Sequence, residues 1–245
     1  MKEINILITI CARGGSKGIV GKNIKLINGK PLIYYTLKSS ALFKESFENS
    51  VDIVLSTDSD EITETVRSLK FDIDTSYSRP DVLATDKAGK IDAIEDVKSF
   101  MEQKFNLEYD FIVDLDVTSP LRTVEDLTTA LYMLRNNEEA FNIFSVNLAN
   151  RNPYFNMVEQ NQNGFYSLSK TGAFFSRQAA PQVYDMNASF YIYKQLFFKE
   201  NLKSAVTNKS LIFEMQHTCF DLDHPIDFDF MEYLLENNKL DFKLI

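Results

Sequence analysis

The stretch Cys11-Ala12-Arg13-Gly14-Gly15-Ser16-Lys17-Gly18-Ile19-Val20-Gly21-Lys22-Asn23, here called the glycine loop, decides how the fold is interpreted. It follows an apolar run at residues 4–10 that predicts a buried strand, and it precedes Pro31, which is well placed to open a helix. Five of the eight glycines of the chain lie before residue 30. Because glycine suits sharp turns and close approach to a ligand, and because three cations accompany it, the loop predicts a polyphosphate site.

Familiar phosphate-binding patterns do not fit the glycine loop. The P-loop pattern would need glycine in place of Ser16 and serine or threonine in place of Asn23. The dinucleotide pattern Gly-x-Gly-x-x-Gly also fails at Ser16. The alternative is a solvated basic turn, which explains neither the clustering of glycine nor the acidity of the surrounding chain.

Composition narrows the class of protein. The 245 residues, 44% of them hydrophobic, fit one large α/β domain or one domain with an appendage. A net charge of −9 argues against general binding to nucleic acid or to a membrane surface. There is no visible signal peptide and no apolar run of membrane-spanning length, and Cys11 and Cys219 suit buried thiols in a reducing compartment. We therefore expect a cytoplasmic enzyme.

Periodicity predicts alternating strands and helices. Strands are expected at residues 4–10, 51–56, 71–75, 111–115, 141–146, 189–193, 211–215 and 218–222. Helices are expected at residues 31–43, 91–105, 195–200 and 225–235, and two more after the turn at residues 57–60 and after the capping box at Thr123. This order predicts an α/β fold with a doubly wound, mostly parallel sheet.

The alternation stops at residues 147–187, which are rich in Asn, Gln and aromatic residues. Because forty irregular residues are unusual inside a compact domain, we expect an inserted arm that packs on a second copy of the chain. Short hairpin strands are expected near residues 164–168. Residues 1–146 and 188–245 would then form the α/β domain.

Four polar clusters follow predicted strands and should meet at one sheet edge. They are the glycine loop, Thr57-Asp58, residues 114–122 and Asp221-Leu222-Asp223. The spacing of Asp221 and Asp223 places both carboxylates on one face of an extended segment, which suits Mg²⁺. The alternative is that one of them caps the last helix and the other is solvated.

Other polar residues leave two roles open. Asp114 and Asp116 repeat the same spacing as Asp221 and Asp223. Either this cluster binds a ligand, or Asp114 or Arg122 is part of a structural ion pair under the loop. His217 and His224 are too isolated for a catalytic pair and are expected to be structural or at the surface.

Three motifs in the same order resemble the acylneuraminate cytidylyltransferases, which are the CMP-sialic acid synthetases and their relatives acting on legionaminic and similar acids. The motifs are residues 12–18 with 21–25, residues 118–122, and residues 220–225. The resemblance implies a Rossmann-like nucleotidyltransferase fold, CTP and a nonulosonic acid as substrates, Mg²⁺ as cofactor, and a homodimer. In the implied reaction the anomeric hydroxyl attacks the α-phosphorus of CTP and pyrophosphate leaves.

The resemblance also implies a role for each matching residue. Triphosphate-contacting catalytic cations are Arg13, Lys17 and Lys22. Nucleotide-binding residues are Ala12, Gly14, Gly15, Asn23, Arg79 and Thr85. Substrate-binding residues are Asp116, Thr118, Ser119, Arg122, Arg177, Gln178, Asn187 and Tyr191, and the Mg²⁺ carboxylates are Asp221 and Asp223.

Departures from the family pattern concern the sugar. Asp116-Val117 stands where many sialic-acid members have Gln-Pro, Ala188 stands where glycine is common, and residues 152–156 lack a frequent lysine. These changes leave CTP in place and favour a legionaminic-type acid. The alternatives are a CMP-Kdo-like or other sugar nucleotidyltransferase, and a non-catalytic nucleotide-binding protein.

Overall fold

The computed structural model describes residues 4–15, 18–47, 50–172, 174 and 176–244. Its main sheet contains β1 (Asn5–Cys11), β4 (Ser50–Ser56), β5 (Phe111–Leu115), β6 (Asn142–Leu148), β9 (Tyr184–Lys194) and β10 (Ser210–Glu214). The strands lie in the order β10-β6-β9-β5-β1-β4, with β9 antiparallel to both neighbours and the other neighbours parallel. The predicted mostly parallel sheet is confirmed.

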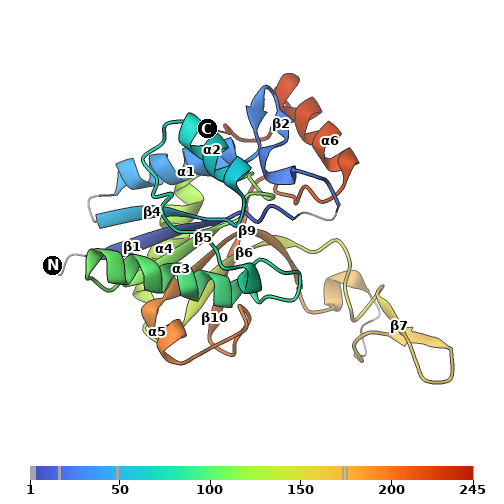
Figure 1. The fold of residues 1–245 in the computed structure, drawn as a ribbon. Helices are drawn as coiled ribbons and strands as arrows, with labels where there is room; N and C mark the ends of the chain where they lie inside the picture. Colours follow the sequence, from blue (N-terminus) through green and yellow to red (C-terminus); the bar gives the residue numbers. More distant parts are fainter. Residues whose placement is uncertain (1–3, 16–17, 48–49, 173, 175, 245) are drawn as a thin grey trace.

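Helices cover both faces of this sheet, as a doubly wound fold requires (Figure 1). They are α1 (Ile33–Ser46), α2 (Asp60–Ser68), α3 (Lys90–Phe105), α4 (Val124–Asn136), α5 (Gln195–Lys199) and α6 (Pro225–Glu236). Along β1, Ile6, Ile8 and Ile10 join the core beneath α1, α4 and α6, whereas Leu7 joins the core beneath α3 and α5. The alternation of strand side chains therefore builds two cores from one strand. No helix in the described part of the chain is both long and apolar enough to cross a membrane.

The start of the first helix differs from the prediction. Pro31 lies in β3 (Lys30–Pro31), which pairs with β2 (Leu26–Ile27), and α1 begins only at Ile33. Asn28 and Gly29 form the turn with φ of 48° and 72°. Because such Asn-Gly turns favour a hairpin, they draw Pro31 into a strand instead of the first turn of the helix.

Two predicted strands are also wrong. Residues 71–75 contribute a single bridge between Asp74 and Val54, and residues 218–222 contain no strand. In the second segment the Leu222 amide donates to the carbonyl of Thr118, which belongs to a loop rather than to a strand.

The predicted capping box is confirmed, because Thr123 and Asp126 bond reciprocally at the start of α4. His224 is the N-cap of α6, and Pro225 is its first residue.

The inserted segment projects away from the sheet as an arm (Figure 1). The strands leading into and out of it are longer than predicted, since β6 and β9 still pair at Leu148 and Tyr184. The expected hairpin consists of β7 (Val158–Gln160) and β8 (Tyr166–Leu168). It exposes 73% of Phe165, an apolar surface that a second copy of the chain could cover. The dimer itself stays a prediction.

Ala188 is expected to be a site of backbone strain. It has φ of 57° within β9, close to the register shift between Phe144 and Val146. Since only glycine adopts this conformation without penalty, Ala188→Gly should raise the free energy of unfolding by about 1 kcal/mol. Urea unfolding tests this. The control Ala41→Gly, within α1, should lower it by about 1 kcal/mol, and a loss of stability in both variants would contradict the strain.

Candidate functional site

Segments that are far apart in the sequence meet beyond the carboxyl ends of β1, β4 and β5. The Gly14 amide donates to Asp58 Oδ1 at 2.8 Å, across 44 residues. Lys22 Nζ lies 3.0 Å from Asp223 Oδ1, across 201 residues. A Cβ placed on Gly18 would lie 3.2 Å from the Asp223 carbonyl oxygen, so glycine permits this close approach. The glycine loop, the end of β4 and the Asp221–Asp223 segment are therefore parts of one site.

Two residues predicted to bind nucleotide also make hydrogen bonds that fix the shape of the glycine loop. The Ala12 amide donates to the Ser56 carbonyl at 2.9 Å, which continues the sheet pairing. Asn23 is only 6% exposed, and its side-chain Nδ2 donates to the Arg13 carbonyl at 3.0 Å. These donors are engaged within the protein, and the nucleotide-binding roles of Ala12 and Asn23 stay predictions. Gly15 is exposed at the loop surface, and Lys17 lies outside the described residues.

A cavity of about 240 Å³ opens beside the glycine loop. Its wall is formed by Cys11, Arg13, Arg79, Leu83, Thr85, Asp86, Ala88, Gly89, Lys90, Ala93 and Asp116. Arg13 pairs with Asp86 at 2.6 Å, and Arg79 donates through Nε and Nη2 to Ser56. The cavity thus brings together three residues that the sequence predicted to bind nucleotide, namely Arg13, Arg79 and Thr85.

The Cys11 thiol in this cavity wall is not a nucleophile. Burial, with the nearby Asp114 carboxylate, raises the pKa of Cys11 to about 12. Only the thiolate is reactive, so the thiol stays protonated and inert at neutral pH. Cys11 therefore contributes apolar surface to the cavity.

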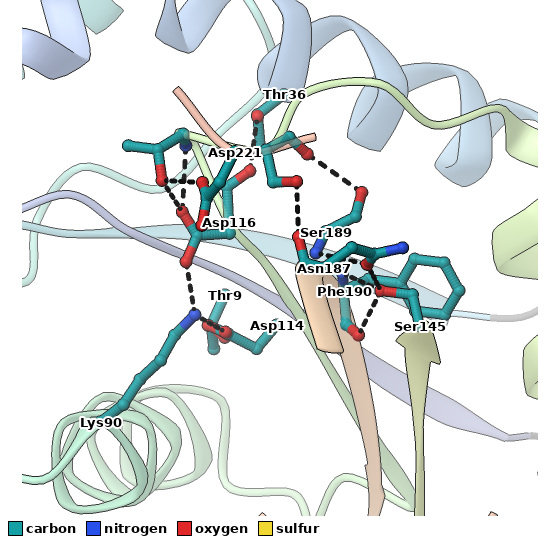
Figure 2. Close-up of polar contacts among 12 residues, drawn as sticks. Thr9, Thr36, Lys90, Asp114, Asp116, Ser145, Asn187, Ser189, Phe190 and Asp221 are labelled. Atoms are coloured by element: carbon teal, nitrogen blue, oxygen red, sulfur yellow. Dashed lines mark hydrogen bonds and ion pairs between the residues drawn. The ribbon is translucent and has the colours of Figure 1, made fainter. Parts of the chain in front are cut away.

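Two carboxylates lie on either side of one hydroxyl group (Figure 2). Thr118 Oγ1 lies 2.9 Å from Asp116 Oδ1 and 2.8 Å from Asp221 Oδ1. A hydroxyl has one proton and can donate to only one of them. Burial, and then the charge of Asp116, raise the pKa of Asp221. In the described part of the chain Lys22 is the cation that acts on Asp221, without outweighing these effects, and a bound cation would add positive charge there.

The carboxylates at this end of the site are few. Asp223 has 61% of its side chain exposed and faces Lys22, while Asp221 is half-buried two residues earlier. Among the described residues, no group of three or more His, Cys, Asp or Glu side chains could hold a metal ion. Mg²⁺ normally uses only one or two carboxylates and fills its other positions with water and phosphate. The two aspartates fit that donor set.

Lys90 is a site residue that the sequence did not reveal (Figure 2). It begins α3, and its Nζ lies 2.8 Å from Asp114 Oδ2 and 2.8 Å from Asp116 Oδ2. Although burial lowers the pKa of Lys90, the two carboxylates outweigh this and raise it well above its ordinary value. Burial alone would raise the pKa of Asp116, yet Lys90 and Thr118 bring it to about 2. Asp114 is thus in an ion pair, as one alternative held, and its partner is Lys90.

Arg122 is buried under the loop that follows β5. The guanidinium is fully buried and donates to Ser189 Oγ at 3.0 Å, to Thr36 Oγ1 at 3.3 Å, and to the carbonyls of Asp116 and Ser119. Burial lowers the pKa of Arg122 to about 10, so it keeps its charge at neutral pH. Its donors are directed at the protein, which gives Arg122 a structural role, and its contact with substrate stays a prediction.

Ser119 and Asn187 form hydrogen bonds that connect the loop after β5 to β6 and β9. Ser119 is fully buried, and its hydroxyl donates to the Asn187 carbonyl at 2.7 Å. The Asn187 side chain accepts from Ser145 Oγ at 2.6 Å and donates to Asn147 Oδ1 at 2.7 Å. The polar atoms of Ser119 and Asn187 thus join β6, β9 and the loop after β5, and their substrate-binding roles stay predictions.

The remaining predicted sugar residues divide between two places. Tyr191 on β9 lies under Lys90, whose Nζ is 5.1 Å from the ring centroid. Gln178 lines a second cavity, of about 360 Å³, at the base of the arm with Asn152 and Pro181. Arg177 lies in the short 3₁₀ helix η3 (Arg177–Ala179). The structure therefore places Asp116, Thr118 and Tyr191 together and assigns Gln178 to a separate cavity.

His217 is structural, as expected. Its Nε2 lies 2.9 Å from Asp126 Oδ2, and its ring stacks on Phe242 with centroids 3.9 Å apart. The next residue, Thr218, donates its amide to both carboxylate oxygens of Asp241 at 3.0 and 3.1 Å. These contacts anchor the start of the segment that leads to Asp221.

The His217–Asp126 pair should make stability depend on pH. Although burial lowers the pKa of His217, its bond to Asp126 outweighs this and leaves the pKa raised above 6.5. A raised folded-state pKa stabilises the protein below the unfolded pKa, and this stabilisation is lost as pH rises through the folded value. We therefore expect His217→Gln to lower the free energy of unfolding by about 1 kcal/mol at low pH and by less at high pH.

Thermal unfolding between about pH 6 and pH 9 measures this difference. His224→Gln, at the only other histidine in the sequence, is the control. A destabilisation by His217→Gln that is equal at every pH would show that the ring acts only through packing on Phe242.

Comparison with known proteins now adds to the geometry. The chain is 39% identical over 241 residues to post-translational flagellin modification protein B of Campylobacter coli, covering 97% of this chain and 98% of that protein. It is 39% identical over 238 residues to CMP-N,N'-diacetyllegionaminic acid synthase of Campylobacter jejuni, covering 96% and 97%. The fold is similar to the solved structure of CMP:2-keto-3-deoxy-manno-octonic acid synthetase complexed with CTP, with a TM-score of 0.66, 17% identity and coverage of 96% and 99%.

The model of one protein family matches nearly the whole chain. The match runs over residues 7–243 and carries the description cytidylyltransferase. It includes the glycine loop, the cavity and the Asp221–Asp223 segment described above. On this match and on the nearly full-length relatives, the chain belongs to the cytidylyltransferase family.

Proposed function

We propose that the chain is a CMP-nonulosonate synthetase that transfers CMP from CTP to the anomeric hydroxyl of a legionaminic-type acid and releases pyrophosphate. The observation that carries the proposal is the meeting of Lys22 and Asp223 at 3.0 Å, on the loop whose Arg13 walls the cavity. A phosphate-binding cation and a metal-binding carboxylate are then neighbours. The name of the Campylobacter jejuni relative supports the choice of sugar acid.

CTP would bind across the cavity and the glycine loop. The 240 Å³ cavity would take the cytosine ring, because Thr85 and the firmly anchored Arg79 lie in its wall. The triphosphate would lie along the loop, where Arg13 and Lys22 neutralise its charge. The Arg13 side chain is 34% exposed in its pair with Asp86, so phosphate oxygens could replace Asp86 as the partner of its guanidinium. Such placement and charge neutralisation supply most of the rate in phosphoryl-type transfer.

Mg²⁺ would be held by Asp221 and Asp223. When bound there, it would neutralise phosphate charge and make the attacking hydroxyl more acidic. On the protein side, Thr118 fixes Asp221 through a 2.8 Å contact, and Lys22 approaches Asp223. These contacts orient both carboxylates before any ligand arrives.

The sugar acid would bind on the opposite side of Asp116 from the cavity. Asp116, Thr118 and the half-buried Tyr191 are the described residues that we assign to it, with Gln178 contributed through the arm. The arm would reach a second copy of the chain, which makes a homodimer part of the proposal. Cytoplasmic location is also part of it, because CTP is an intracellular nucleotide.

A substrate panel tests the proposal. Purified protein with Mg²⁺ and CTP should release pyrophosphate with N,N'-diacetyllegionaminic acid, more slowly with N-acetylneuraminic acid, and not with UTP in place of CTP. Absence of release with every nonulosonic acid, pseudaminic acid included, would falsify it.

One alternative has its own support. The structural likeness to CMP:2-keto-3-deoxy-manno-octonic acid synthetase supports a CMP-Kdo-like activity as the alternative. Including Kdo in the same panel separates the two, since release with Kdo alone would favour the alternative. No release with any acid, but intact CTP binding, would favour a non-catalytic nucleotide-binding protein.

A further inference from the structure

Lys90 connects parts of the site that no sequence pattern links. Its ammonium lies 2.8 Å from both Asp114 and Asp116 (Figure 2). It also lies 5.1 Å from the centre of the Tyr191 ring. Thr9 Oγ1 fixes the other oxygen of Asp114 at 2.9 Å. Since 38% of the Lys90 side chain is exposed while Asp114 has no exposure, the lysine reaches from the surface to a buried anion.

Without Lys90 the two carboxylates would repel each other. Asp114 is fixed inside the sheet, whereas Asp116 is 23% exposed and follows the strand. Like charges this close disfavour each other, so the more exposed Asp116 would turn toward solvent or share a proton with Asp114. Lys90 therefore holds the Oδ2 side of Asp116, while Thr118 holds its Oδ1 side.

Asp116 lies at the border between two parts of the site. It is in the wall of the cavity assigned to CTP. Its Oδ1 also accepts from the amide and the hydroxyl of Thr118, the hydroxyl that contacts Asp221. Each carboxylate oxygen has further acceptor capacity, and an anion accepts from a hydroxyl or amide N–H but repels a carboxylate. Asp116 is thus suited to a donor group of the sugar acid.

We propose that Lys90 is a positioning residue that fixes Asp116 to accept a hydrogen bond from a hydroxyl or amide N–H of the sugar acid. Sugar-acid binding then depends on Lys90 more strongly than CTP binding does, even though Lys90 also lines the cavity assigned to CTP. The inference rests on the proposed function and deepens it at the sugar side of the same site.

The decisive variant removes the positioning without changing the net charge. Lys90→Met with Asp114→Asn keeps the cluster at one negative charge and leaves no orphaned buried carboxylate. We expect kcat/KM for the sugar acid to fall by about 100-fold, mainly through KM, because misplacement by about 1 Å has that effect. The dissociation constant for CTP, measured by calorimetry without sugar, should change much less, by at most about tenfold, although Lys90 also lines the CTP cavity.

A second ion pair on the same helix provides a matched control. Lys104 also lies on α3, is 37% exposed, pairs with Asp74 at 2.5 Å and lies over an aromatic ring. Lys104→Met with Asp74→Asn should leave both sugar and CTP parameters unchanged. Lys90→Arg, which keeps the charge, should recover part of the sugar affinity.

Three results would overturn the inference. Unchanged KM for the sugar acid in the Lys90 double variant would make the lysine a structural residue only. A loss of CTP affinity equal to the loss of sugar affinity would assign it to the nucleotide cavity. If the double variant does not fold, Asp116→Asn, which keeps the Lys90–Asp114 pair, must show the same sugar-specific loss.

The wild-type protein separates this inference from the proposed function. No pyrophosphate release by wild type with any nonulosonic acid would refute the function, and the inference with it. Active wild type with unchanged variants would refute only the role of Lys90.

Discussion

Replacing Asp223 with asparagine is expected to reduce CTP-dependent pyrophosphate release by about 1000-fold, because the proposed Mg²⁺ site loses one of its two carboxylates. The fold should be retained, since 61% of the Asp223 side chain is exposed and asparagine has the same shape. Steady-state kinetics measures the first effect, and thermal unfolding measures the second. Binding of Mn²⁺, followed by its paramagnetic resonance signal, should weaken in parallel.

The control for this variant is Asp229→Asn on the exposed side of α6, which should change neither activity nor Mn²⁺ binding. Asp223 also pairs with Lys22, so Lys22→Met is needed to separate the two roles. If Lys22→Met weakens activity but keeps Mn²⁺ binding, the carboxylate acts on the metal. Full activity in Asp223→Asn would contradict the metal role.

Replacing Arg122 with methionine is expected to lower the free energy of unfolding by about 3–5 kcal/mol. The guanidinium donates to acceptors on α1, on β9 and in the loop after β5, all of them buried with it. Methionine fills similar volume but leaves those acceptors without donors. Since a domain is stabilised by only about 5–15 kcal/mol in total, the loss is severe. Urea unfolding measures it.

Arg135→Met provides the comparison, because Arg135 is exposed on α4 and its replacement should change stability by less than about 0.5 kcal/mol. Arg122→Lys should retain part of the stability, since one ammonium satisfies fewer acceptors than the guanidinium. Equal stability of Arg122→Met and wild type would mean that water replaces the lost donors.

The alternation of strands and helices could be predicted because it depends on the local spacing of apolar residues and on helix-capping residues. Strand β5 and the Thr123 capping box are signals contained within a few residues. The segment at residues 218–222 has the same apolar character but lacks a neighbouring strand, and sheet pairing is a property of the tertiary fold. The prediction that Pro31 opens a helix was wrong for a different reason. The Asn28-Gly29 turn favours a hairpin, and this outweighed the preference of proline for a helix start.

The chemistry of the site was predictable where residue type alone carries it. Glycine and cations before residue 30 predict a phosphate loop, and Asp221 with Asp223 predict a cation site; the structure brings Lys22 and Asp223 together, and both roles stay predictions. Burial was not predictable, so the sequence did not show that the Arg122 and Asn23 side chains are buried and bonded to neighbouring loops. Lys90 was missed because nothing in the sequence relates residue 90 to residues 114 and 116 before the sheet brings them together.

The contacts of Asp241 and Phe242 with residues 217–218 have a consequence for how the protein is made. Synthesis proceeds from the amino terminus, so the segment carrying Asp221 and Asp223 emerges from the ribosome before the residues that hold its start. The sheet edge that receives CTP, formed by β1, β4 and β5, is complete much earlier. A nascent chain should therefore acquire its nucleotide pocket first and its carboxylate segment last, once residues near 242 have been added.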